Sequence, residues 1–571
     1  MMGQIHKYVK LRFPWFTKLW HQFTNGLYNN QMLWLLLWGA SMLSIIDIPI
    51  SIEFHMPHAL QVAYTVFVGV FKSTLIFICF LLCNKYKWSR IIAYIAIGLL
   101  ILLSIINYSS LHFFGFGITR RMISIVMQTN SGETTEFLSY VGSLITDTLL
   151  SWTFWLTIAG CCSIMYLIRF IPKNILSWTV TAFSAVGFTI VLVFSITFTS
   201  GRTAHSLLLR MIKYGIETYQ DLKHLNELIQ DMPPLPDADT ISSTHAASTV
   251  VIVIGESASR IHWSIYGYPL STTPRISAMS DSLYIMSDVI GSSTSTSLNM
   301  ENILTFRNDD TPEGNTLHYP RLIDLFNRAG YKTFWLSNQE KSGLISNLSA
   351  ALVSNADEIN YVGAQSSEDL LISRFDEVLL PYLQKALNDN AKYKMIFLHL
   401  HGSHVVYSSR FPSEARYFTA DSIKVARSNM GYSDDEAYTI AEYDNSIRYT
   451  DQLLGDILKE ISKSLEPTVF IYFSDHGVNV YDTDKIHGRS ERYVMVPAIA
   501  YLNSTYRHYN PDIAAAFERA VNLPISTASL TYPLMTLTGT TYSHYEPTRD
   551  FLSTQYLCRH RYVDGEQWKW E

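Results

Sequence analysis

Four side chains able to bind a divalent metal ion, together with one hydroxyl, are the most informative residues of this chain. In order along the sequence they are Glu256, Thr296, Asp475, His476 and His487. Carboxylates and imidazoles are common ligands of zinc, and a hydroxyl beside a metal ion can become a nucleophile. Glu256 and the Asp475–His476 pair each follow an apolar, β-branched run, where an open α/β sheet carries its ligands. The pattern predicts a zinc centre beside a nucleophilic hydroxyl.

A histidine-rich segment strengthens the metal interpretation. An Asp-His-Gly triplet on its own is equally well explained by an aspartate that caps a turn beside a half-buried histidine. The run from Leu398 to His404 contains three more histidines. His404 follows Gly402, where the chain is expected to turn into a loop, so we expect it to reach the site. His399 is expected to be a core histidine.

A loop of small hydroxyl residues, Gly291–Ser297, supplies the candidate nucleophile. It opens an amphipathic helix that runs through Met300, Ile303 and Leu304, and helix N-termini favour anions such as phosphate. Serine and threonine are also the ordinary N-caps of helices. Composition alone therefore does not single out one hydroxyl of this loop.

The second half of the chain alternates between strand and helix patterns. Apolar β-type runs predict strands at Thr249–Ile254, Thr333–Leu336, Met395–Leu398 and Val469–Phe473. Helical periodicity predicts helices at Arg321–Ala329, Leu370–Leu387 and Ala437–Ile461. Such alternation is typical of an α/β domain with a mainly parallel sheet covered by helices on both faces. Because ligands bind beyond the carboxyl ends of the strands, four strands that end in polar residues are expected to share one site.

The first 200 residues instead contain five long apolar stretches, each close to the ~20 residues that cross a bilayer. They are roughly Met32–Ile52, Val62–Leu82, Ile91–Leu111, Leu149–Ile168 and Leu176–Thr199. Lysine and arginine concentrate in the N-terminal segment and in the second and fourth loops, which marks these parts as cytoplasmic. An odd number of spans then puts the rest of the chain on the far side of the membrane. The N-terminus lacks a small-residue cleavage site, so we expect an uncleaved anchor.

These patterns divide the chain into three parts. We expect a transmembrane domain of five helices at residues 1–200, an amphipathic bridging helix and proline-rich linker at 201–241, and a catalytic domain at 242–571. The loop Phe114–Ser143 is expected to form short helices on the membrane surface. Only Cys558 of the five cysteines falls in the exported part, so no disulfide is expected there. No nucleic-acid partner is expected.

Taken together, several motifs resemble those of the phosphoethanolamine transferases, which are inner-membrane enzymes of Gram-negative bacteria in the alkaline phosphatase/sulfatase superfamily. The motifs are Gly255-Glu256-Ser257 with Arg260, Tyr266–Pro269, Thr296, Gly402–His404, Ser474–Gly477 and His487-Gly488. The resemblance covers nearly the whole chain. The surface-loop motif of the family is similar to Gln128–Asn130 with Glu133 and Glu136. Three segments look most similar to the branch that modifies lipopolysaccharide core heptose: Phe334–Gln339, Tyr472–Thr483 and Glu546–Arg549.

The resemblance implies zinc-dependent transfer of phosphoethanolamine from phosphatidylethanolamine to a cell-envelope glycan or lipid, either lipopolysaccharide core or lipid A. The protein would lie in the bacterial inner membrane with its catalytic domain in the periplasm. Thr296 would attack the donor phosphorus and carry the group as a covalent intermediate. The implied ligands of the catalytic Zn²⁺ are Glu256, Thr296, Asp475 and His476.

The resemblance also implies residues around that centre. His404 and His487 would bind a second Zn²⁺ or the phosphate oxygens. Contacts with the substrates are implied for four further residues: Asn338, Lys341, Asn130 and Glu133.

The chain also departs from the family pattern. Val478 stands where many relatives have a glutamate, and the nucleophile loop lacks the Cys-Gly-Thr of lipid A-modifying relatives, which argues mildly against lipid A. A phosphoglycerol transferase or phosphodiesterase on the same scaffold is one alternative, and a catalytically silent membrane sensor or scaffold is another. A sulfatase is disfavoured because the loop contains no Cys-x-Pro-x-Arg or Ser-x-Pro-x-Arg element.

Overall fold

The computed structural model describes residues 58–83, 211–220, 240–307, 319–339, 348–362, 375–482, 493–557, 561–563 and 566–567, with single positions and short stretches between 18 and 235. The chain divides into two compact units, the first made of Met1–Met127 and Ser139–Gln220 and the second of Gln128–Leu138 and Asp221–Glu571. The predicted domain limits at 200 and 241 remain predictions.

Helix α5 (His58–Cys83) is the longest element of the first unit that the structure describes, and it contains the second apolar stretch. The ring of Phe67 stacks on that of Phe183, with 4.9 Å between centroids, and the Ser184 hydroxyl donates to Thr74 Oγ1 at 2.8 Å. None of the helices in the described part of the chain combines the length and apolar character needed to cross a membrane. The five spans therefore stay a prediction.

The second unit is built around a seven-stranded sheet with the order β3-β9-β8-β2-β7-β5-β6. Its strands are β2 (Thr249–Gly255), β3 (Tyr284–Met286), β5 (Lys332–Ser337), β6 (Glu358–Tyr361), β7 (Lys394–His399), β8 (Thr468–Ser474) and β9 (Ala498–Leu502). Strands β8, β2, β7, β5 and β6 are mutually parallel. The prediction of a mainly parallel sheet, with strands in the four expected places, is confirmed.

Three two-stranded pairings complete the strands of the described residues. They are β1 (Ile241–Ser243) with β11 (Thr540–Tyr542), β4 (Asp288–Ile290) with β10 (Pro524–Ser526), and β12 (Tyr562–Val563) with β13 (Glu566–Gln567).

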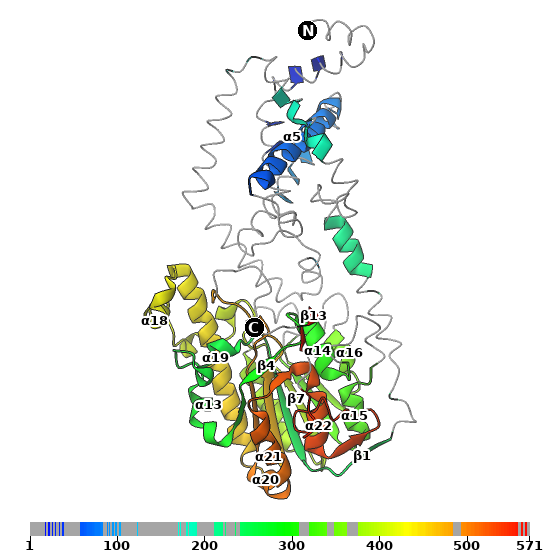
Figure 1. Ribbon diagram of the computed structural model, residues 1–571, viewed down its shortest axis with the longest axis vertical. Coiled ribbons are helices and arrows are strands. Elements are labelled where there is room, and N and C mark those ends of the chain that lie inside the picture. Colours follow the sequence, from blue (N-terminus) through cyan, green and yellow to red (C-terminus); the bar gives the residue numbers. More distant parts are fainter. Residues whose placement is uncertain are drawn as a thin grey trace. The chain divides into compact units, whose positions relative to one another are not determined.

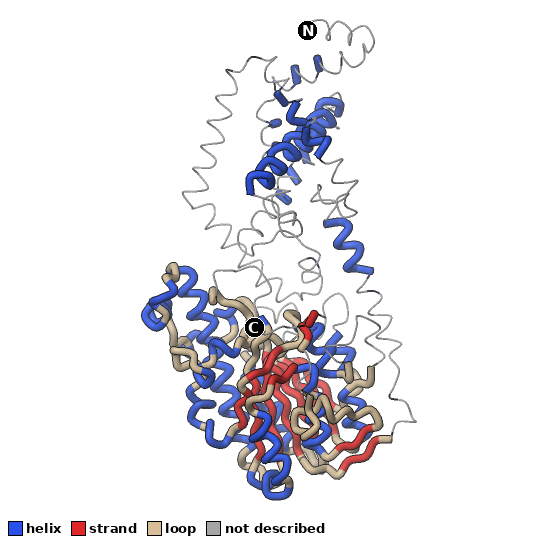
Figure 2. Tube along the Cα trace, in the orientation of Figure 1, coloured by secondary structure: helices blue, strands red, loops and turns tan. Residues whose placement is uncertain are grey.

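Helices cover both faces of the sheet (Figures 1 and 2). One face carries α14 (Thr296–Leu304), α15 (Leu322–Arg328), α16 (Leu348–Leu352), α20 (Ser504–Tyr509), α21 (Pro511–Ala520) and α22 (Thr531–Thr538). The other carries α13 (Pro274–Ala278), α17 (Leu380–Leu387), α18 (Ala420–Ala426) and α19 (Asp434–Ile461).

The central strand β2 shows why both faces need helices. Its seven residues are all buried, and successive side chains of a strand point to opposite faces. Val250, Ile252 and Ile254 pack into the first core, whereas Val251 and Val253 pack into the second. A continuous run of β-branched residues is therefore what this position requires.

One strand departs from the parallel direction, and one predicted helix boundary is wrong. Strand β9 lies between β3 and β8 and runs antiparallel to both, so this side of the mainly parallel sheet is mixed. Helix α17 begins at Leu380 rather than Leu370. Pro381 occupies its first turn, the position where the missing amide hydrogen costs nothing, and the described residues just before it form a 3-10 turn, Asp376–Leu379.

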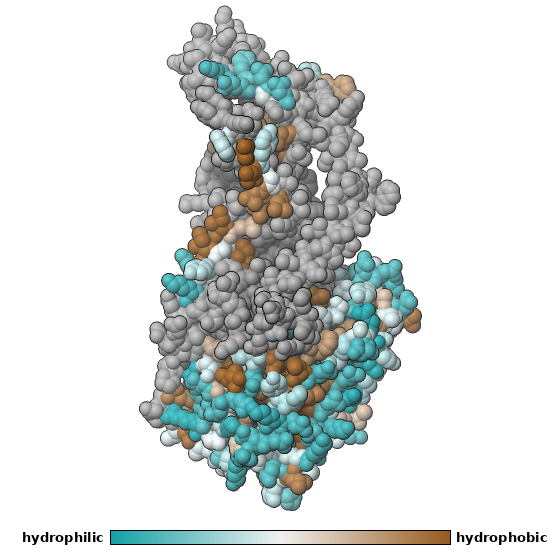
Figure 3. Space-filling view, turned by 180° about the vertical axis from the view of Figure 1, so that it is seen from behind, coloured by the Kyte–Doolittle hydropathy of each residue, from teal (hydrophilic) through white to brown (hydrophobic). Residues whose placement is uncertain are grey.

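Helix α19 extends along the second face and is longer than predicted. It begins at Asp434 because Ser433 and Glu436 form a capping box, and three acidic residues occupy its first turn, where they favour the positive end of the helix dipole. The outer surface of the second unit is largely hydrophilic when viewed from behind (Figure 3).

Candidate active site

The sheet brings four polar strand ends to one edge. Strands β8, β2, β7 and β5 are successive neighbours, and in their registers Gly255 pairs with Ser474 while Ile254 and Ser337 both pair with His399. The residues that follow these strands must therefore meet. The ends of the four strands thus lie side by side, as expected.

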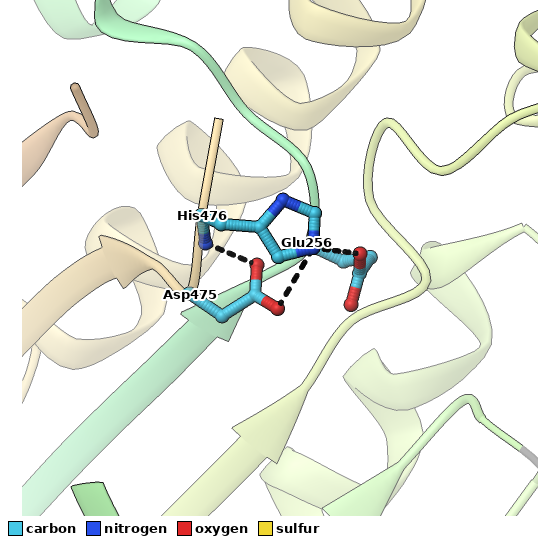
Figure 4. Close-up of side chains that lie close together, drawn as sticks. All are labelled: Glu256, Asp475 and His476. Atoms are coloured by element: carbon cyan, nitrogen blue, oxygen red, sulfur yellow. Dashed lines mark hydrogen bonds and ion pairs between the residues drawn. The ribbon is translucent and has the colours of Figure 1, made fainter. Parts of the chain in front are cut away.

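Glu256, Asp475 and His476 converge at this edge (Figure 4). His476 Nε2 lies 3.4 Å from Glu256 Oε1 and 3.5 Å from Asp475 Oδ2, and one ligand atom from each residue falls within 4.8 Å of the others. Glu256 is 1% and Asp475 0% exposed, while the His476 side chain keeps 12% of its surface accessible. Two carboxylates and an imidazole at this spacing form a suitable set of zinc ligands.

The two carboxylates of this trio favour a positive charge beside them, either an imidazolium or a metal ion. Burial and the charge of Glu256 raise the pKa of Asp475. Burial opposes protonation of His476, but the two carboxylates outweigh it and raise the pKa of His476. Although burial acts against it, the hydrogen bond and charge of His476 lower the pKa of Glu256. Asp475 Oδ2 is buried without a hydrogen-bond partner, which is costly unless a ligand satisfies it.

These pKa shifts predict how zinc affinity depends on pH. His476 must lose its proton to bind a metal ion, and its pKa is raised, so binding near neutral pH should displace about one proton. We therefore expect the affinity to fall roughly tenfold for each pH unit between 8 and 6, and more steeply where Asp475 is also protonated. Competition with a chromophoric chelator measures this slope, and an affinity independent of pH would contradict the ligand assignment.

Thr296 lies beside the trio at the first position of α14. Its hydroxyl is 3.1 Å from Glu256 Oε2 and 3.3 Å from His476 Nε2. The loop before it is held by Asn299, whose Nδ2 donates to the carbonyls of Ser293 and Ser295 at 2.7 and 3.1 Å. The predicted helix after this loop is confirmed, and Thr296 is the loop hydroxyl for which contacts with Glu256 and His476 are described.

The backbones of four segments of the site approach closely in two pairs. Gly402 has a φ of +54°, and a Cβ there would lie 2.6 Å from the carbonyl oxygen of Glu256. A Cβ at Gly291, at the start of the nucleophile loop, would lie 2.4 Å from the carbonyl oxygen of Asp475. Glycine is the residue that permits such close approaches.

The histidines of the strand β7 segment differ in their surroundings. Burial lowers the pKa of His399 to about 4, so it is a neutral core histidine, as expected. His404 is half-buried, and its ring centroid is 5.8 Å from that of His401. The backbone amide of Ser403, the preceding residue, donates to the carbonyl of Glu256 at 2.9 Å, which brings the loop of His404 next to the centre.

Asn338 is buried and its Nδ2 donates to Asp376 Oδ1 at 2.8 Å. The same carboxylate accepts from the backbone amides of His401 and Gly402, both at 2.8 Å. These contacts make Asn338 part of the support for the loop after β7, and its implied contact with substrate stays a prediction. Four other predicted site residues lie outside the described residues: His487, Lys341, Asn130 and Glu133.

Several supporting residues were not found from the sequence. Gln339 Nε2 lies 3.4 Å from Glu256 Oε2 and 3.0 Å from the carbonyl oxygen of Leu400. Asp376 and Asn299 stabilise the loops described above, and neither stands in a recognisable pattern. Val478 is half-buried against the second core, so this departure from the family adds an apolar contact.

Comparison with known proteins shows which protein family the second unit belongs to. Residues 248–540, more than half of the chain, match the family model described as sulfatase. Phosphoethanolamine transferase EptC of Escherichia coli (strain K12) is 30% identical over 358 residues. The match spans 60% of this chain and 60% of EptC, which is less than two thirds of that protein.

Two solved structures are similar. The C-terminal periplasmic domain of EptC from Escherichia coli, in complex with Zn, is 29% identical with a TM-score of 0.52, and the match covers 58% of this chain and 93% of that domain. The integral membrane protein lipooligosaccharide phosphoethanolamine transferase A (EptA) from Neisseria meningitidis has a TM-score of 0.61 and 18% identity. That match covers 91% of this chain and 98% of EptA. At this identity it shows a similar fold and nothing further.

Proposed function

Because the chain belongs to the sulfatase family, we propose that its site performs a phosphoryl-type transfer, and specifically that the protein is a zinc-dependent phosphoethanolamine transferase. The donor is phosphatidylethanolamine and the acceptor is a cell-envelope glycan or lipid, either lipopolysaccharide core or lipid A. The named relative EptC supports this choice of group.

One observation carries the proposal. The Thr296 hydroxyl lies 3.1 Å from Glu256 Oε2 and 3.3 Å from His476 Nε2, within a trio that is suited to a metal ion. A nucleophile must lie within such reach of the groups that activate it. Thr296 also stands at the N-terminus of a nine-residue helix, where the backbone amides and the helix dipole favour a phosphate group.

Glu256, Asp475 and His476 would hold the Zn²⁺, which would supply a positive charge that favours the ionised hydroxyl and screens the phosphate oxygens. Thr296 Oγ1 attacks the donor phosphorus, and the bond from phosphorus to the diacylglycerol oxygen breaks. Thr296 then carries the phosphoethanolamine group until an acceptor oxygen takes it in a second displacement. His404 and His487 are assigned to a second Zn²⁺ or to the oxygens of the transferred phosphate group.

The location of the protein belongs to the same proposal. A lipid donor requires a catalytic domain at a membrane surface, and the five apolar stretches of the first 200 residues supply the anchor. We assign the protein to the bacterial inner membrane, with residues 242–571 in the periplasm. The fold likeness to the integral membrane protein EptA over 91% of the chain supports this assignment.

Intact-protein mass spectrometry tests the proposed function. After incubation of the full chain with phosphatidylethanolamine, we expect an added mass of roughly 123 Da, because covalent catalysis passes through such an adduct. Phosphatidylglycerol should leave the protein unmodified. An adduct from phosphatidylglycerol alone would replace the transferase with the phosphoglycerol alternative, and no adduct or product from either lipid would contradict both.

A further inference from the structure

A second buried polar cluster lies outside the metal centre, around His262. Its ring is held between two carboxylates, with Nδ1 2.6 Å from Asp444 Oδ1 and Nε2 3.1 Å from Asp482 Oδ2. The side chains of His262 and Asp444 are fully buried and that of Asp482 is 2% exposed. Burying a charge costs free energy unless a partner of opposite charge lies beside it. A buried group of this kind is therefore a candidate for a functional role.

The charges of the cluster balance only when His262 is an imidazolium. Two carboxylates face the ring, Asp444 and Asp482, and Arg427 Nη2 donates to Asp482 Oδ1 at 3.0 Å. The Tyr268 hydroxyl donates to Asp444 Oδ2 at 2.7 Å. Burial opposes the charge on His262, but the two aspartates outweigh it and raise its pKa to about 9.

The cluster joins three elements that surround the metal centre. His262 follows Glu256 in the loop after β2, Asp444 belongs to α19, and Asp482 ends the described segment after His476. Tyr443, next to Asp444, also packs its ring 4.9 Å from that of His262.

Hydrogen bonds also join the loop after β2, the segment after β8 and helix α19 next to the candidate metal ligands. The Ser257 amide donates to Asp475 Oδ1 at 3.1 Å, and the Ala258 amide donates to Ser474 Oγ at 2.9 Å. The Tyr443 hydroxyl donates to the carbonyl of Ser257 at 2.8 Å. Ser257 has a positive φ of 57°, a conformation that costs energy and needs such support.

We propose that His262 is a positioning residue, which as an imidazolium ties the loop after Glu256 and the segment after His476 to helix α19. It touches none of the three ligand side chains. Its effect is to fix the separation of the two loops that carry Glu256 and Asp475–His476. Direct hydrogen-bond partners of metal ligands change metal affinity and activity about 10- to 100-fold, and His262 acts one step further out, so we expect an effect at the lower end of that range. Its effect on catalysis rests on the proposed function, whereas its effect on zinc affinity does not.

The sign of the pH dependence follows from the direction of the shift. A raised pKa means that the ion pairs contribute fully below about 6.5 and are lost as the pH rises through about 9. The groups that face His262 are Asp444 and Tyr443 from α19, Asp482 from the segment after β8, Tyr268 from its own loop, and Arg427 from the end of α18 through Asp482. We therefore expect an alkaline limit of activity near the pKa of His262.

Two variants of the full chain test this role, with kcat, KM for phosphatidylethanolamine and zinc affinity measured between pH 6.5 and 10. His262→Gln should lower kcat and zinc affinity about tenfold or more at pH 7.5, with a smaller effect on KM. Asp482→Asn removes one carboxylate beside the ring, so the alkaline limit should move down by about one pH unit. A residue with a merely structural role would not move this midpoint.

The control is His508→Gln, the same change at an exposed histidine of the same unit, which should behave as wild type. Wild-type kcat and zinc affinity in His262→Gln, or an unchanged alkaline midpoint in Asp482→Asn, would overturn the assignment. If His262→Gln does not fold, Asp482→Asn decides. If the wild-type protein transfers no phosphoethanolamine, the proposed function is contradicted. The zinc affinities of wild type and His262→Gln would still decide the positioning role of His262.

Discussion

Thr296→Ala should abolish phosphoethanolamine transfer, with kcat falling at least ~1000-fold because the group that forms the covalent bond is gone. The mass adduct should disappear with it. Zinc should remain bound, since Glu256, Asp475 and His476 keep their positions and only one hydroxyl at 3.1 and 3.3 Å is removed. Mass spectrometry and metal analysis of the same preparation measure both results.

Two further variants make this result specific. Thr296→Ser keeps a hydroxyl at the same place and should retain part of the activity. Thr294→Ala, the same change two positions earlier, should retain most of it. Full activity and an adduct in Thr296→Ala would remove the nucleophile assignment, and the adduct would then be sought on Thr294 by peptide mapping.

Asp475→Asn should have opposite effects on the thermal stability of the metal-free protein and of the zinc-bound protein. In the metal-free protein Asp475 is buried beside Glu256, which raises its pKa, so a neutral side chain relieves repulsion and the thermal midpoint should stay the same or rise. In excess zinc the wild type gains stability from binding, about 2.7 kcal/mol at one hundred times the dissociation constant. The variant should lose most of this gain, together with its activity.

Asp550→Asn is a matched control for this test. Asp550 is also a buried carboxylate, but it accepts hydrogen bonds from the hydroxyls of Thr536 and Tyr545 and is not one of the three residues of the candidate metal site. Its replacement should lower the metal-free stability by about 1–3 kcal/mol and leave the zinc-dependent gain in place. Calorimetry of both variants with and without zinc gives the comparison. An unchanged zinc-dependent gain in Asp475→Asn would exclude Asp475 as a ligand.

Much of the catalytic domain follows from local patterns. A fully buried parallel strand needs a continuous apolar run, and the runs at β2, β5, β7 and β8 are visible in the sequence for this reason. The polar residues directly after these runs mark the site, because the carboxyl ends of parallel strands meet at one edge. The strands β3, β6 and β9 were not predicted, since short strands carry a weak pattern.

The side chains that support the site could not be predicted in this way. Asp376 holds the loop of His401 and Gly402, and Asn299 holds the loop before Thr296. Each is a common polar residue whose role depends on partners that only folding brings near. His262 is the clearest case, because its two aspartates lie 182 and 220 positions away.

The residue types of the candidate metal site, the strands that carry them and the edge of the sheet where they meet could all be read from the amino-acid sequence, because strand periodicity and chain direction are local properties. The tertiary structure decided which hydroxyl of the nucleophile loop lies beside Glu256, which histidines are core residues, and how the charges of Glu256, Asp475 and His476 balance. Those outcomes depend on distances and burial between distant segments. No local pattern contains them, since the energy of a buried charge is set by whatever neighbours the complete fold provides.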